Sequence, residues 1–72
     1  MYIVTEIQTN ADGTIGLINN SYEDRNQAES KYHAILSAAA VSSLPKHSAI
    51  IFTDDAMMEN GQCYKHEDEA NE

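Results

Sequence analysis

The sequence predicts an α+β fold of the order ββαββ, a four-stranded antiparallel sheet with one helix packed across it. Three observations carry this prediction. An alternating run at 2–9 is followed by a turn cluster and a second run at 14–19. A long segment with apolar residues at helical spacing comes next, and it is followed by two short runs with the composition of β-strands. One helix across a four-stranded sheet is the simplest architecture that accommodates these elements.

The first two strands are predicted to form a hairpin. Residues 2–9 alternate, so that one face carries Ile3, Thr5 and Ile7. The cluster 10–13 contains an Asp-Gly pair, which tolerates the positive φ that a tight hairpin needs. The returning strand at 14–19 brings three more apolar side chains, Ile15, Leu17 and Ile18.

A single helix is predicted over 25–43. Asp24 suits its N-cap, and Gln27 three residues later can complete a capping box. The helix should end before Pro45, because proline disfavours helical geometry at the residue before it. One stripe at helical spacing consists of Ala28, Tyr32, Ile35, Leu36, Ala39 and Ser43. The apolar surface is widened beyond this stripe by Ala34, Ala38 and Val41, so we expect a second sheet or a partner subunit on the helix.

The remaining elements are a third strand at 48–53, a loop at 54–61 and a fourth strand at 62–66. The third strand is rich in β-branched residues and should be central. A single ββαββ domain therefore spans 1–66. The acidic stretch 67–72 has no hydrophobic pattern and is expected to be a disordered tail.

Length and composition limit the classes of function. A chain of 72 residues buries a small core, and Cys63, as the only cysteine, cannot form a disulfide within one chain. Self-association is the remaining common source of stability, so we expect a homo-oligomer, a dimer or higher. The net charge of −8 argues against nucleic acid as a partner. With no signal peptide and no apolar run of membrane-spanning length, we expect a cytoplasmic protein without a membrane partner.

Enzymatic and metal functions find little support in the motifs. Cys63 and His66 have a C-x-x-H spacing, but residues three apart on a strand point to opposite faces. Neither a nucleophile elbow nor a glycine-rich phosphate loop is present. The pair Asp54-Asp55 is explained more simply as part of a turn than as an acid/base dyad. We therefore expect no enzyme activity, no cofactor and no metal.

The helix and its exit carry the side chains that a nucleotide-like ligand needs. Such ligands use an aromatic plane for the base, hydroxyl partners for the sugar and cations for phosphate. Here these groups are Lys31, Tyr32, His33, Ser42, Ser43, Lys46 and His47, with Tyr64 and His66 able to complete a pocket from the fourth strand. Lys31 and Ser43 are about 18 Å apart along a helix. Two antiparallel copies of the helix across a two-fold axis could bring both ends onto one ligand.

A purely structural interpretation of the same residues is also open. Tyr32 would then form the edge of the core, while Lys31 and His33 would be solvated. Ser42 and Ser43 would bond backbone carbonyls at the end of the helix.

The central run has the sequence KYHAILSAAAVSS at 31–43, followed by PKHSA at 45–49 and by the closing CYKH at 63–66. These segments resemble small uncharacterised proteins that phages and prophages of Firmicutes encode, with the motif KYHxILxAAAVSSxPxH. The resemblance covers about the last two-thirds of the chain and implies a context, phage interference with a bacterial host. Small oligomeric phage proteins include sponges that trap immune nucleotide signals, such as cyclic dinucleotides or ADP-ribose derivatives. The link to sponges is an analogy of size, expected oligomery and context.

Two classes of function follow from these observations. The first is an anti-defence protein of the infected host cytoplasm that sequesters a small anionic nucleotide at a subunit interface without turnover. The alternative is an acidic inhibitor that binds a host defence protein as a DNA mimic, through Glu6, Glu23, Asp24, Glu29, Asp54, Asp55 and Glu59. A structural protein of virion assembly, with the helix as an oligomer interface, is a further alternative.

Overall fold

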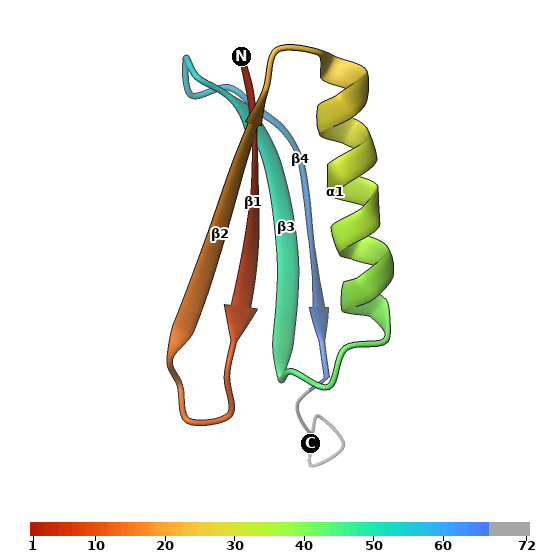
Figure 1. Cartoon of the computed structure of the whole chain (residues 1–72). Coiled ribbons are helices and arrows are strands. Elements are labelled where there is room, and N and C mark those ends of the chain that lie inside the picture. Colours follow the sequence, from red (N-terminus) through yellow and green to blue (C-terminus); the bar gives the residue numbers. More distant parts are fainter. Residues whose placement is uncertain (67–72) are drawn as a thin grey trace.

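The computed structural model describes residues 1–66 and has the predicted element order. The elements are β1 (Tyr2–Thr9), β2 (Ile15–Tyr22), α1 (Arg25–Ala40), β3 (Lys46–Thr53) and β4 (Met58–Lys65). The four strands form one antiparallel sheet in the order β2-β1-β3-β4, with α1 along one side of it (Figure 1). The ββαββ prediction is confirmed. The expected acidic tail, 67–72, lies outside the described residues.

The hairpin forms as predicted, but β2 is longer than the sequence indicated. The backbone N–H of Asn10 closes the turn by donating to the Thr14 carbonyl at 2.8 Å, and Gly13 adopts a φ of 91°. β2 then continues to Tyr22, whereas the polar residues after position 18 were expected to end it at Asn19. That end is wrong because the backbone keeps pairing with β1 as far as the partners Tyr2 and Tyr22. Polar side chains do not interrupt a backbone ladder at a sheet edge.

The helix begins as predicted and ends earlier. Asp24 is the N-cap, and its carboxylate accepts the backbone N–H of Asn26 at 3.1 Å. The helix ends at Ala40, so the predicted end at Ser43 is wrong. The last carbonyls are satisfied by the tight turn that follows, in which Ser42 N–H donates to the Ala39 carbonyl at 3.2 Å.

Both later strands extend beyond their predicted bounds. β3 begins two residues before the expected 48–53, and β4 begins at Met58 although 54–61 was expected to be a loop. The loop prediction is wrong over 58–61 because a bulge between Ile51 and Phe52 lets the ladder continue past an extra residue. β3 is central, as predicted, with β1 and β4 on its two sides.

The core lies between α1 and one face of the sheet. The helix packs most closely against β3. The buried cluster contains Val4, Ala49 and Ile51 from the sheet together with Ala28, Tyr32, Ile35 and Leu36 from the helix. Five of the six stripe residues are therefore buried as predicted, since Ala39 is buried as well; Ser43 is exposed and lies beyond the helix.

The other face of the sheet is not covered by any described element (Figure 1). Alternation and strand register assign to it four residues from each strand, which we call the open face. These are Ile3, Thr5, Ile7 and Thr9 of β1, Ile15, Leu17, Asn19 and Ser21 of β2, Lys46, Ser48, Ile50 and Phe52 of β3, and Met58, Gly61, Cys63 and Lys65 of β4. The helix residues Ala34, Ala38 and Val41 are also exposed, so no second layer of this chain covers them.

Candidate functional site

Six of the nine predicted ligand residues gather at one end of the fold, where the helix ends, β3 begins and β4 ends. We call them the helix-exit cluster: Ser42, Ser43, Lys46, His47, Tyr64 and His66. The helix has already ended at Ala40, and the chain turns there because the Ser42 hydroxyl accepts the Leu44 N–H at 3.0 Å and Pro45 keeps Leu44 out of helical geometry. The turn then delivers Lys46 directly into register with Thr9 of β1.

The aromatic part of the cluster connects β4 to the end of the helix. His66 donates its Nε2 proton to the Ala39 carbonyl at 2.7 Å, and its backbone N–H donates to the Pro45 carbonyl at 2.6 Å. The rings of Tyr64 and His66 are nearly parallel, at an interplanar angle of 6° with centroids 6.3 Å apart. Both rings are half-buried, so each keeps part of its surface available to solvent.

His47 lies deeper than the rest of the cluster. It is 5% exposed, and its Nε2 donates to the Glu6 carboxylate at 2.6 Å. Gln8 donates to the same carboxylate oxygen at 2.9 Å. Burial of Glu6 opposes its ionisation, but these two hydrogen bonds and the charges of His47 and Lys31 lower its pKa below the ordinary value. His47 Nδ1 is buried without a hydrogen-bond partner among residues 1–66.

Two lysines of the cluster region are neighbours across the sheet. Lys46 and Lys65 are directly opposed in the register of β3 and β4, and both belong to the open face. Sequence reasoning missed Lys65. The signal that could have identified it is the strand alternation, which places it on the face opposite Tyr64. The pairing brings two ammonium groups to adjacent positions of the sheet.

The three remaining predicted residues lie higher on the helix, away from the cluster. Tyr32 is 2% exposed and belongs to the core, and burial raises the pKa of its hydroxyl. His33 is exposed beside it, the two rings meeting edge-on with centroids 5.3 Å apart. Lys31 is half-buried and contributes to the field on Glu6. The structure therefore does not bring the two ends of the predicted constellation together within one protomer.

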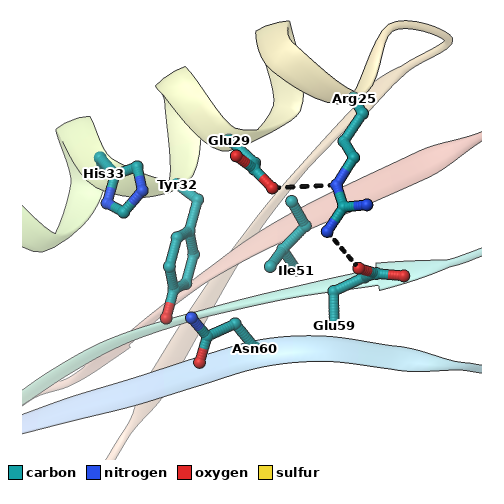
Figure 2. A pocket seen from close by; sticks show the side chains of 7 residues that line it. All are labelled: Arg25, Glu29, Tyr32, His33, Ile51, Glu59 and Asn60. Atoms are coloured by element: carbon teal, nitrogen blue, oxygen red, sulfur yellow. Dashed lines mark hydrogen bonds and ion pairs between the residues drawn. The ribbon is translucent and has the colours of Figure 1, made fainter.

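A small cleft lies between the first half of α1 and the start of β4 (Figure 2). It has a volume of about 230 Å³ and is lined by Arg25, Glu29, Tyr32, His33, Ile51, Glu59 and Asn60. Arg25 stands between two carboxylates, with Nε bonded to Glu29 and a terminal nitrogen bonded to Glu59, both at 3.0 Å. Because both acids already compensate the guanidinium, this cleft offers an anion no uncompensated charge. The spacing of Arg25 and Glu29 is that of neighbours on one helix face, whereas Glu59 joins them only through the fold.

The described residues were compared with the requirements of a metal site and of a membrane span. Within residues 1–66, no three histidine, cysteine or carboxylate side chains are close enough to hold one ion. Cys63 belongs to the open face, whereas His66 contacts the helix on the other side of the sheet. None of the described helices is both long and apolar enough to span a membrane.

Comparison with known proteins gave no relative: neither a family model, nor a curated protein, nor a solved structure matches this chain. The residues themselves therefore carry the functional argument.

Proposed function

We propose that this protein is a non-enzymatic binding module that holds a small anionic, nucleotide-like ligand at the helix-exit cluster and acts by sequestration. One observation carries the proposal. Hydroxyl, aromatic and imidazole groups from the ends of α1, β3 and β4 gather on the helix side at one end of the fold, and two ammonium groups lie at the same end on the other side of the sheet. Sites for nucleotides combine these same groups.

Each group has a role that fits its position. Lys46 and Lys65 are opposed where β3 begins and β4 ends, so they supply positive charge for phosphate from the end of the sheet, on the side opposite Tyr64. Tyr64, half-buried with His66 parallel to it, offers an aromatic surface to a base. Ser43 is exposed and can bond a sugar hydroxyl. Tyr64 thus takes the stacking role that the sequence had suggested for Tyr32.

Binding without turnover agrees with how the histidines of the cluster are used. A general base must be within hydrogen-bond reach of the proton that it removes. His47 Nε2 is already bonded to Glu6, and His66 Nε2 is already bonded to the Ala39 carbonyl. Both imidazoles therefore serve the fold, which supports a role in holding a ligand over a role in transforming it.

The resemblance to phage and prophage proteins gives the proposal a biological form. In that setting the protein acts in the infected bacterial host against a nucleotide signal of its defence, a cyclic dinucleotide or an ADP-ribose derivative. Sequestration by binding lowers the free concentration of such a signal without chemistry.

The experiment is calorimetry of the full chain against 3′3′-linked cyclic dinucleotides, cyclic ADP-ribose isomers and ADP-ribose, followed by recovery of the ligand. We expect one class to bind and to be recovered intact. Lys65→Gln should weaken its binding about 5- to 10-fold, which corresponds to about 1–1.4 kcal/mol for one charged contact. Arg25→Gln removes the same charge at the opposite end of α1, where Arg25 pairs with Glu29 and Glu59, and is the matched control. Absence of binding across the panel, consumption of the ligand, or equal losses in both variants would refute the proposal.

A further inference from the structure

The open face has the composition of an interface. Its apolar members form a nearly continuous surface across all four strands, made of Ile3, Ile7, Ile15, Leu17, Ile50, Phe52 and Met58. Three of these side chains are exposed to an unusual degree for their size: Ile15 and Leu17 are 61% exposed, and Met58 is 64% exposed. A contiguous apolar surface of this kind on a water-soluble domain marks a site of association.

The size of the open face is suited to a protein partner. Four strands about 4.8 Å apart, each eight residues long at about 3.4 Å per residue, give a flat footprint of about 500 Å². The relief of the side chains adds accessible area to this figure. A standard interface buries about 800 Å² on each partner, and a biological interface should bury at least about 1,000 Å² in total, a value that two such faces reach together.

The hydroxyl of Thr5, near the centre of the face, does not oppose its burial. Thr5 is 8% exposed, and its hydroxyl donates to the Asn19 side-chain oxygen at 2.6 Å. This bond pairs the hydroxyl with a neighbour on the same face, so it loses little when water is removed. Burial of an unpaired hydroxyl would instead cost about 1–3 kcal/mol.

The distribution of charge indicates which partner fits. The chain carries a net charge of −8, yet none of the open-face positions is acidic. The acids of residues 1–66 lie on the helix side of the sheet, in turns or around the helix: Glu6, Asp12, Glu23, Asp24, Glu29, Asp54, Asp55 and Glu59. Two copies of an acidic protein repel each other wherever carboxylates meet. The open face has no carboxylate, and its two lysines, Lys46 and Lys65, lie together at one end, so two copies can approach on this face without opposing carboxylates.

We propose that the open face is the interface of a homodimer, in which two copies pack sheet against sheet around a two-fold axis. Each sheet then covers the apolar face of the other, and the two helices lie on the outside of a four-layer particle. This arrangement covers the second side of the sheet, which a 72-residue chain with one helix leaves open. It moves the expected seam from the helix, where the sequence suggested it, to the opposite side of the molecule.

The test uses full-length protein without any ligand, so its result does not depend on the proposed nucleotide binding. Sedimentation equilibrium should give a mass near twice the 8.0 kDa of the chain. Leu17→Glu and Met58→Glu each place a carboxylate on the open face at an exposed position and should reduce the mass to that of one chain. Val41→Glu, at an 84% exposed position outside this face, is the matched control and should stay dimeric. Circular dichroism checks that the variants fold.

The thiol of Cys63 gives a second readout, because it is exposed in one protomer and belongs to the open face. Its alkylation by iodoacetamide should slow as the concentration of the wild-type protein rises, and should be independent of concentration in Leu17→Glu. A wild-type protein that stays monomeric at high concentration would overturn the proposal. If that monomer adsorbed to lipid vesicles, the open face would be a membrane-binding surface instead. A multimer that survives both open-face variants, or one that Ala38→Glu dissociates instead, would place the seam at a strand edge or on the helix and would equally overturn it.

Discussion

Ile50 and Ile51 are consecutive residues of β3 that point to opposite sides of the sheet, and their truncation to alanine measures what each side contributes. Ile51 is 2% exposed in the core beneath the helix, whereas Ile50 is half-buried on the open face. Both residues are isoleucines of the same strand. A difference between the two alanine variants therefore reports how much each face of the sheet is covered.

The expected magnitudes differ clearly. Ile51→Ala removes three fully buried carbon groups at about 0.8 kcal/mol each and leaves a cavity, which places the loss within the range of about 2–5 kcal/mol. A domain of this length has a total stability of about 4–11 kcal/mol, so this variant is close to unfolding. Ile50→Ala in a single protomer loses only part of that transfer free energy, about 1 kcal/mol.

Urea denaturation followed by circular dichroism at two protein concentrations is the assay. At low concentration Ile51→Ala should lower the midpoint much more than Ile50→Ala. At high concentration the cost of Ile50→Ala should grow, because the open face is then buried in the proposed dimer. Equal costs at low concentration would refute the assignment of the two faces. A cost of Ile50→Ala that does not change with concentration would contradict the dimer.

Two further predictions concern the Glu6–His47 pair and the turn before β4. The pKa of Glu6 is lowered in the fold, so the stability that its charge contributes is complete above the ordinary value of 4.5 and is lost as pH falls through the lower folded value. In urea denaturation, Glu6→Gln should be less stable than wild type at pH 7, and this difference should shrink below pH 4.5. A difference in stability that does not depend on pH would contradict this reasoning. Ala56 has a φ of 72°, which a residue with a Cβ adopts at a cost. Ala56→Gly should therefore stabilise the protein by about 0.5–1 kcal/mol in thermal unfolding, and a loss of stability would show that the backbone there is not strained.

Local sequence signals predicted most element types because each depends on residues that are close in the chain. The Asp-Gly turn, the Asp24 cap and the helical stripe are examples. The ends of elements were predicted less well. The polar run after Ile18 was expected to end a strand, yet it continues to pair with β1. That outcome depends on a partner strand, which no local pattern describes.

The candidate site was predicted in part, for a similar reason. Ser42, Ser43, Lys46 and His47 are neighbours in sequence, so any chain turn after the helix keeps them close. Tyr64 and His66 join them through the pairing of β3 with β4. Tyr32 was expected to contact a ligand, but the position of the helix over β3 buries it. A period of 3.6 residues identifies the buried stripe without indicating how deeply each member lies.

By itself the sequence determined the order of strands and helix, the hairpin, the start of the helix and the residues that form its buried stripe, because turn chemistry, capping and periodicity act over a few residues. Only the tertiary structure decided that β1 pairs with β3, that Glu6 meets His47 across these central strands, and that the second side of the sheet has no cover. These features depend on contacts between residues as many as 51 positions apart, as in the pair of Tyr2 with Thr53, and their free energy exists only when the whole sheet has assembled.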